Sequence, residues 1–411
     1  MSKNIVLGVG VVLVLCVGVG ANGGAQTTGE GGKQAQRVEG IQAQELGDYG
    51  RIVVLHLGKP GGYFDRMTGK PVLGLENKFL FGFSEGLCPV WDFGAHQDGY
   101  IDRRGNYAFP PRFAGVLPFS EGRAVVDAGD AGYGVIDKQG EWVAPAGKYE
   151  AFGSYSDGLC AFRTGDRWGF LDRDGKAALK ARYTSVFEDL APEFHDGLAL
   201  MGEGNIGRCY IDTKGRKLAL PKGVEAFGPF SEGLASVLPT PTPGAIWKEA
   251  ASGKKGHEGK SGFGFISRAG KMVIEMQFAS AGDFSEGLAA ASLNDGRFVY
   301  DPDSGYDLGK PRVAKGGAPR WGFIDGTGKV AIPMDYEMVG PFKEGLARVM
   351  KDGKWGYIDR MGKMAIAPEL VMAWDFKDGL AKVLLADKTY GFVDMTGKMI
   401  IRTGVEKELR W

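Results

Sequence analysis

Apolar and polar residues alternate in short runs along most of the chain, and glycine or aspartate separates the runs. The stretch 342–368 shows the pattern best, with the sequence FKEGLARVMKDGKWGYIDRMGKMAIAP. In the run 346–350 one face is apolar and the other carries Arg348, which predicts a half-exposed β-strand. The run 355–358 is apolar on both faces, which predicts a strand covered on both sides. A third apolar run follows after a turn.

The same pattern returns along the chain with a period near 35 residues. An acidic residue followed by glycine marks each copy, and an aromatic residue stands three positions before the glycine. These glycines are Gly86, Gly122, Gly158, Gly197, Gly233, Gly287, Gly345 and Gly379. A fixed period of this length indicates one supersecondary unit repeated many times. Tyr49 to Asp65 fits a degenerate first copy, so about nine units are predicted over residues 49–403.

A second motif, Asp-x-x-Gly, joins the last two apolar runs of a unit. Aspartate and glycine at this spacing predict a type I turn that a left-handed glycine closes, with the aspartate bonding the turn's own amides. We expect these residues to be structural. The clearest pairs are Asp172 with Gly175, Asp325 with Gly328, and Asp359 with Gly362.

Three Trp-Gly pairs begin the strand that is apolar on both faces. They are Trp168-Gly169 in RWGFLD, Trp321-Gly322 in RWGFID and Trp355-Gly356 in KWGYID. These segments resemble the bacterial WG (KWG) repeat, and the resemblance covers about residues 49–401. It implies all-β repeats that are often exported and have no generally assigned activity. It carries over no catalytic residue.

Some copies depart from the WG pattern. Asp98-Gly99 and Arg208-Cys209 replace the Trp-Gly pair, and Ser267 replaces a turn aspartate. The tryptophans that remain could form a ladder that stacks on sugars or peptides. Because their strand is apolar on both faces, we interpret them as structural core.

The predicted fold is all-β, with three-stranded β-meander units of about 35 residues stacked as an open solenoid. The alternative is a closed, propeller-like ring. Propellers commonly close with four to eight blades, and one blade is often completed from both chain ends. Nine units whose ends do not complement each other therefore favour the solenoid.

The N-terminus has the pattern of a secretory signal peptide, predicted over residues 1–25. Lys3 precedes an apolar run from Ile5 to Val19, which is shorter than the ~20 residues that span a bilayer. Leu15 before Cys16 disfavours a lipoprotein signal. We expect a cleaved protein that is periplasmic or secreted, with a flexible spacer at 26–48 and a tail at 404–411. No membrane span is expected after cleavage.

The composition narrows the function. The chain of 411 residues carries 50 basic and 50 acidic residues, which argues against nucleic-acid binding. Its four histidines lie in no metal or nucleophile motif, so no catalytic, metal or cofactor site is predicted. Three cysteines would remain after cleavage, in slots that other copies fill with alanine or glycine, and no disulfide framework is expected.

Two insertions mark the candidate binding face. They occupy about 238–261 and 292–319, between the first and second strands of adjacent units, and insertions at one loop position map to one face of a repeat array. The candidate partner-binding residues are Trp247, Lys254, Lys255, His257, Arg297, Tyr300 and Tyr306. We predict a non-enzymatic protein that binds a protein or cell-wall partner. The alternative is an envelope enzyme acting on glycans, or its accessory module.

Overall fold

The computed structural model shows a chain built from β-strands. It describes residues 51–54, 62–65, 71–74, 78–80, 82–92, 94–186, 190–203, 207–240, 262–293 and 320–405, with side chains from 82 to 402. Within these residues the one helical element is a 3-10 turn, Gly129–Ala131, and no helix is long and apolar enough to cross a membrane. The all-β prediction is confirmed. The predicted signal peptide, the spacer and most of the tail lie outside the described residues.

The strands of the first half form four antiparallel sheets in chain order. The first holds β1 (Arg51–Val54), β2 (Gly62–Asp65) and β3 (Pro71–Gly74). The second holds β4 (Lys78–Leu80), β5 (Cys88–Asp92), β6 (Gln97–Ile101) and β7 (Tyr107–Phe113). The third holds β8 (Gly115–Val116), β9 (Arg123–Asp127), β10 (Tyr133–Asp137) and β11 (Trp142–Ala144). The fourth holds β12 (Ala151–Ser156), β13 (Leu159–Thr164), β14 (Arg167–Leu171) and β15 (Ala177–Tyr183).

The second half continues in the same way. The fifth sheet holds β16 (Phe194–His195), β17 (Leu198–Glu203) and β18 (Gly207–Asp212). The sixth has seven strands: β19 (Val224–Ser231), β20 (Leu234–Pro239), β21 (Phe263–Ser267), β22 (Met272–Ser285), β23 (Leu288–Leu293), β24 (Trp321–Asp325) and β25 (Val330–Tyr336). The seventh holds β26 (Met338–Val339), β27 (Leu346–Lys351), β28 (Lys354–Asp359) and β29 (Met364–Leu370). The eighth holds β30 (Met372–Ala373), β31 (Leu380–Leu384), β32 (Thr389–Asp394) and β33 (Met399–Val405).

These sheets correspond to nine units, because the seven-stranded sheet contains two. The 14-residue strand β22 pairs with β21 through its first half and with β23 through its second half. We number the units 1 to 9: the first five sheets are units 1–5, the seven-stranded sheet is units 6 and 7, and the last two are units 8 and 9. Most units have a short additional strand before the three that the sequence predicts.

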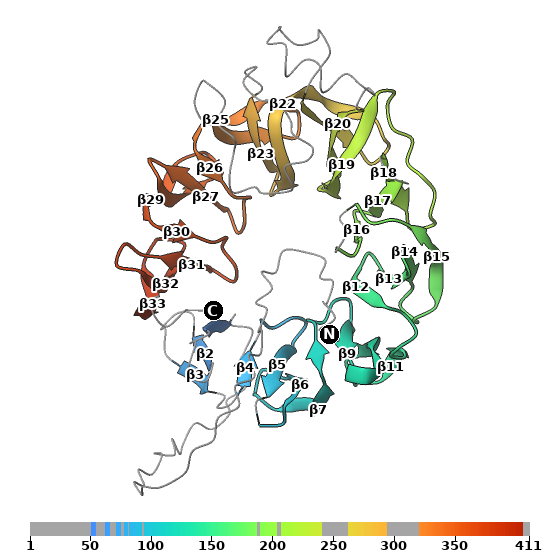
Figure 1. Ribbon diagram of the computed structural model, residues 1–411. Coiled ribbons are helices and arrows are strands. Elements are labelled where there is room, and N and C mark those ends of the chain that lie inside the picture. Colours follow the sequence, from blue (N-terminus) through green and yellow to red (C-terminus); the bar gives the residue numbers. More distant parts are fainter. Residues whose placement is uncertain are drawn as a thin grey trace, which may run out of the picture.

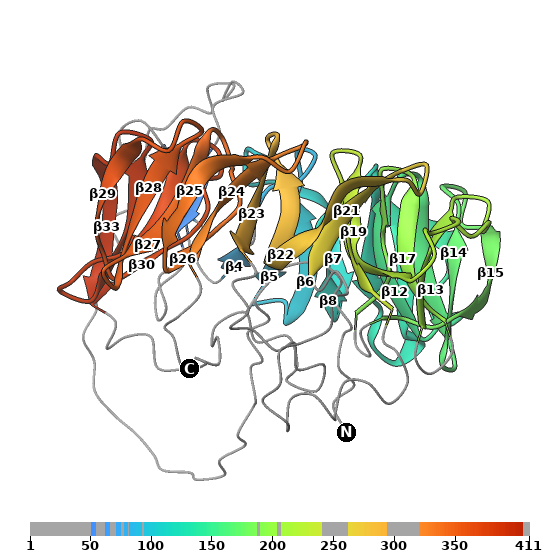
Figure 2. The same cartoon turned by 90° about the horizontal axis from the view of Figure 1, so that it is seen from above.

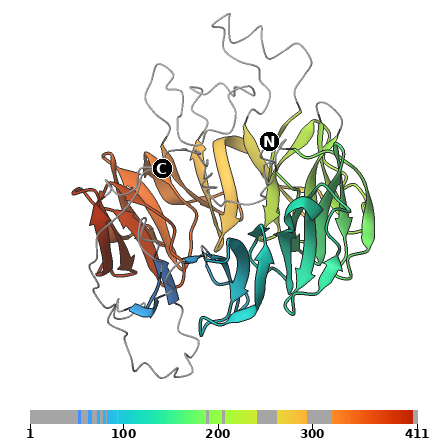
Figure 3. The same ribbon diagram turned by 60° about the horizontal axis from the view of Figure 1, so that its bottom comes forward.

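The sheets follow one another around a central opening (Figure 1). In unit 4 the first strand, β12, lies toward the opening and the last strand, β15, toward the outside (Figure 1). Seen from the side, the strands run roughly along the axis of the ring (Figure 2). The first sheet lies beside the last one in Figures 1 and 3. The predicted open solenoid is therefore not confirmed; a small rotation between successive units accumulates into strong curvature.

The burial of the strands explains their sequence patterns. In unit 8 the strand β28 is buried at four consecutive positions, whereas burial alternates along the outer strand β29. The core lies between successive sheets, since Tyr357 of β28 packs in one cluster with Phe376 and Val383 of unit 9. One unit alone cannot cover β28 on both sides, and its neighbours complete the core.

The glycine of the Trp-Gly pair has a steric reason. The outer strand bulges over β28, since Trp355 pairs with Leu370 but Tyr357 pairs with Ile366. A Cβ on Gly356 would lie 2.6 Å from the Ile366 carbonyl oxygen, which no side chain tolerates. Gly169 and Gly322 have the same surroundings, at 2.6 Å and 2.4 Å from the nearest carbonyl oxygen. Backbone of the outer strand occupies the space that a side chain would need.

Candidate binding surface

Aromatic pairs join successive units. The aromatic residue of the Trp-Gly strand packs in a tilted or edge-to-face geometry on the aromatic residue of the next unit's acidic-Gly motif, as Tyr357 does on Phe376 at 4.9 Å between ring centroids. Such geometry is favourable for aromatic rings. The other pairs, at 4.7–5.0 Å, are Tyr100–Phe119, Phe170–Phe194, Tyr210–Phe230, Phe265–Phe284 and Phe323–Phe342.

The acidic-Gly motifs form a second series of contacts. At each joint from unit 2 to unit 9, the acidic side chain accepts a hydrogen bond of 2.7–2.9 Å from the glycine N–H of the next unit's motif. The pairs are Glu85–Gly122, Glu121–Gly158, Asp157–Gly197, Asp196–Gly233, Glu232–Gly287, Glu286–Gly345 and Glu344–Gly379. Each carboxylate therefore links two repeats.

These acidic residues adopt a backbone conformation that ordinary residues avoid. Glu121 has φ of 52° and Gly122 has φ of 77°, and the other acidic-Gly motifs repeat these values closely. Two successive positive φ angles are the geometry of a type I′ hairpin turn, where asparagine or glycine is usual. Aspartate tolerates this conformation, whereas glutamate rarely adopts it. In the motifs that carry glutamate, the link to the next unit offsets the resulting backbone strain. In the sequence these residues are recognisable only as the marker of each copy, and the link to the next unit is not visible there.

Serine adds a third contact in five joints. The hydroxyl of Ser120, which precedes Glu121, donates to the carbonyl of Tyr155 in the next unit at 2.7 Å. The remaining pairs are Ser84–Phe119, Ser156–Phe194, Ser231–Phe284 and Ser285–Phe342. The aromatic pair, the carboxylate hydrogen bond and the serine hydrogen bond all connect the acidic-Gly motif of one unit to the neighbouring unit.

The Trp-Gly tryptophans lie mainly inside the array. Trp168 is 2% exposed and Trp355 is 7% exposed, while Trp321 is half-buried. The guanidinium groups of Arg163 and Arg348 lie over the rings of Trp168 and Trp355, at 5.8 Å and 5.4 Å. The two buried tryptophans are thus unavailable as a stacking surface for an external sugar or peptide.

The Asp-x-x-Gly turns have the geometry that their sequence predicts. The Asp359 carboxylate accepts the N–H groups of Met361 and Lys363, each at 2.9 Å, and Gly362 has φ of 79°. Asp172 and Asp325 bond their turns in the same way, and Gly175 and Gly328 also have positive φ. These turns are structural elements.

The candidate partner-binding residues lie outside the described residues: Trp247, Lys254, Lys255, His257, Arg297, Tyr300 and Tyr306. The strands that flank their loops are described. The first loop joins β20 to β21 and the second joins β23 to β24, and all four strands belong to the seven-stranded sheet. Both loops therefore leave one continuous sheet from equivalent positions.

One cluster of nucleophile-type and acid–base residues lies between units 4 and 5. The Cys160 thiol donates to the Gly153 carbonyl at 3.1 Å, and burial raises the pKa of this thiol. Burial also raises the pKa of the Glu193 carboxyl, to about 7, although the Ser154 N–H lowers it. His195 Nε2 lies 3.8 Å from Glu193 Oε2. A thiol that stays protonated is a poor nucleophile. Cys88 and Cys209 are also buried thiols.

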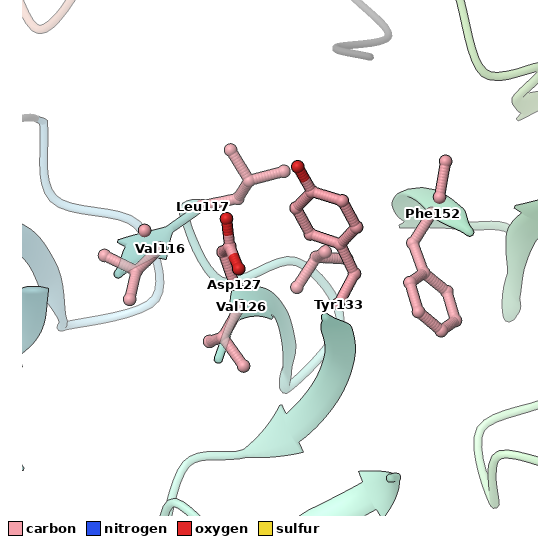
Figure 4. Close-up of a pocket in the computed structure, with 9 residues that line it drawn as sticks. Val116, Leu117, Val126, Asp127, Tyr133 and Phe152 are labelled. Atoms are coloured by element: carbon pink, nitrogen blue, oxygen red, sulfur yellow. The ribbon is translucent and has the colours of Figure 1, made fainter. Parts of the chain in front are cut away.

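A cavity of about 20 Å³ lies between units 3 and 4 (Figure 4). Leu117, Asp127 and Tyr133 line it on the side of unit 3, and Phe152 lines it from unit 4. A space of this size holds about one water molecule. It is too small for a sugar or a peptide side chain.

The repeats match a known family. A model described as WG containing repeat matches residues 99–130, 133–168, 263–296, 321–355 and 355–388. The chain is a WG-repeat protein. Comparison of this WG-repeat protein with curated proteins gives no significant match.

Solved structures match the chain at low sequence identity. A crystal structure of the eukaryotic initiation factor matches the WG-repeat protein at 11% identity, over 85% of this chain and 94% of that chain, with a TM-score of 0.51. AztD from Citrobacter koseri matches at 15% identity over 87% and 95% of the chains, with a TM-score of 0.37. The computationally designed Ika8 protein matches at 13% identity over 70% and 85%, also at 0.37. At 11% identity the first match supports the fold class alone.

Proposed function

We propose that this WG-repeat protein is an exported, non-enzymatic scaffold that binds a protein or cell-envelope partner. The observation that carries the proposal is the common origin of the two insertions. Both leave the seven-stranded sheet β19–β25 between equivalent strands, and both begin beside the middle of β22, where Phe278 pairs with Phe263 of β21 and with Leu293 of β23. Insertions gathered in this way are typical of the binding face of a repeat array.

The surroundings of the repeat residues favour a binding role over the alternative of a glycan-acting enzyme. A glycan enzyme of this type would use exposed aromatic residues beside a pair of carboxylates. Trp168 and Trp355 are buried, and the carboxylates of the acidic-Gly motifs bond the next unit's amides. The recurring residues thus support the array, which leaves the loops as the distinctive surface.

We also propose that the array acts as a closed ring and not as an open stack. The sheets follow a circle in Figure 1, and the first lies beside the last. In addition, a Cβ on Gly82 in unit 2 would lie 3.8 Å from Lys377 Nζ in unit 9. This proximity of the second and last units supports closure.

Loop replacement tests the binding role. In unit 8 the equivalent strands meet through Asp352-Gly353, whose φ angles of 51° and 71° fit a two-residue type I′ turn. Replacing residues 240–261 and 294–319 each by Asp-Gly should therefore preserve the strands. We expect the melting temperature to change little, and capture of a partner from the native envelope fraction to be lost. A variant with both loops scrambled is the matched control for loop length. Capture of the same partner by the loopless protein would move the binding site to the strands.

A further inference from the structure

The residue just before the aromatic position of the acidic-Gly motif lies at the joint with the preceding unit. In most units this slot holds an uncharged residue: Gly82, Pro118, Ser154, Pro229 or Pro341. Units 5, 7 and 9 instead hold Glu193, Asp283 and Asp375. Asp283 is exposed, whereas only 8% of the Glu193 side chain is exposed.

Asp375 shows how a carboxylate is accommodated in this slot. Its Oδ1 lies 2.7 Å from Arg348 Nε, and Arg348 comes from β27 of the preceding unit. The guanidinium therefore balances the charge of Asp375 across the joint between units 8 and 9. A buried carboxylate is stable in its ionised form only with such a partner.

Glu193 has no equivalent cation. Ala161 of β13 occupies the position that Arg348 has in β27, one residue after Cys160 or Ala347. The segment before Glu193 packs closely on unit 4, because a Cβ on Gly153 would lie 2.9 Å from Ala191 and 3.4 Å from Ala161. Glu193 Oε1 is buried without a hydrogen-bond partner.

The groups around Glu193 do not supply a positive charge. The Cys160 thiol on β13 stays neutral, because burial and the negative charge of Glu193 both raise its pKa, and the Ser154 N–H donates a hydrogen bond to Glu193. His195 Nε2 lies 3.8 Å away on the same unit. Burial lowers the pKa of His195 although Asp157 and Asp196 oppose this, so the imidazole is neutral near pH 7.

We propose that the joint between units 4 and 5 is a pH-sensitive contact, tightly packed while Glu193 carries a proton and loosened when Glu193 ionises. A carboxyl group that is buried in the folded protein and hydrated after opening binds its proton more strongly in the packed joint. The joint is therefore most stable at acidic pH, and its stability falls as pH rises through the pKa of Glu193. The inference is independent of the proposed partner binding.

Hydrogen exchange of the full-length protein tests the proposal. Peptides covering residues 194–201 report on the joint between units 4 and 5, and peptides covering 376–383 report on the joint between units 8 and 9. We compare protection factors, corrected for intrinsic exchange, at about pH 5.5 and about pH 8.5, on either side of the titration. Protection at the first joint should fall at least about tenfold. This is the change expected when opening of the joint releases one proton from Glu193 and the pH rises by one unit. Protection at the second joint should stay within about twofold, because Asp375 keeps its cation.

Two variants separate the charge of Glu193 from its shape. Glu193→Gln keeps the shape without the ionisable group and should remove the pH-dependent loss at residues 194–201. Glu193→Ser introduces the residue type that unit 4 has in this slot. It should also remove the pH-dependent loss of protection, and it serves as the second variant if Glu193→Gln folds poorly. Equal behaviour of the two joints in the wild type, or an unchanged loss in a folded variant, would overturn the proposal.

Discussion

The carboxylate of Glu121 accepts a hydrogen bond from the backbone N–H of Gly158 in the next repeat, at 2.9 Å. The same carboxylate lies 2.9 Å from Arg173 Nη2, also in the next repeat. Glu121 thus contacts two separate turns of its neighbour. Because equivalent carboxylates repeat around the array, the unit-to-unit contacts form a continuous series, and each one should contribute to stability.

We predict that Glu121→Ala destabilises the protein by roughly 1–2 kcal/mol, since it removes a charge-assisted hydrogen bond that is partly exposed. Chemical denaturation measures the change in the free energy of unfolding. Glu141→Ala is the control, because Glu141 is exposed and should change stability by less than about 0.5 kcal/mol. Equal effects of the two substitutions would mean that the link between repeats is unimportant.

Gly356 offers a second test, of the steric argument for the Trp-Gly pair. Gly356→Ala places a methyl group against the Ile366 carbonyl and should cost about 1–3 kcal/mol, as overpacking of a core does. Gly326→Ala is the control: its Cβ would meet nothing within 4 Å and its φ is not positive. Thermal melting of both variants distinguishes the packing effect from the general effect of replacing glycine. Similar melting temperatures would show that the outer strand can move away from Gly356.

The core role of the tryptophans leads to a third prediction. Trp355→Ala should lower the free energy of unfolding by about 3–5 kcal/mol, because it empties a large buried site and removes the ring beneath Arg348. Denaturant titration measures this loss. A loss below about 1 kcal/mol, together with abolished partner binding, would instead identify Trp355 as a surface recognition residue.

Much of a single repeat could be predicted from the sequence, because its determinants are local. Alternation in 346–350 specifies a half-buried strand, the apolar faces of 355–358 specify a covered one, and Asp359 bonds amides two and four residues later. Such patterns act within one unit. They are visible without knowledge of the neighbours.

The relations between repeats could not be predicted in the same way. The ring depends on the rotation at each joint, which follows from packing between residues about 35 positions apart. The contact of Glu121 with Gly158 spans 37 residues, and the sequence around Glu121 explains only the turn. The continuity of β22 through two units could not be predicted either. Residues 279–285 resemble the starts of other units, and in those units a separate sheet begins.

Asp98 occupies the slot that Trp168 and Trp355 fill in other repeats. It is 6% exposed, and its Oδ1 has no hydrogen-bond partner. Burial raises the pKa of Asp98 to about 7, the Val116 N–H opposes this, and the negative charge of Asp127 adds to it. Because the pKa is higher in the folded protein than the ordinary value of 3.8, the folded state binds the proton more strongly.

The raised pKa of Asp98 determines how stability should depend on pH. The stabilisation from protonated Asp98 is fully present below about pH 4 and is lost as pH rises through about 7. We predict that Asp98→Asn melts at a higher temperature than the wild type at about pH 8.5, and that the difference disappears near pH 4. Asp130→Asn is the control, since Asp130 is exposed. Melting curves across this pH range measure the effect. If Asp98→Asn and the wild type kept a constant difference at every pH, Asp98 would be ionised throughout, and an unseen partner would have to balance its charge.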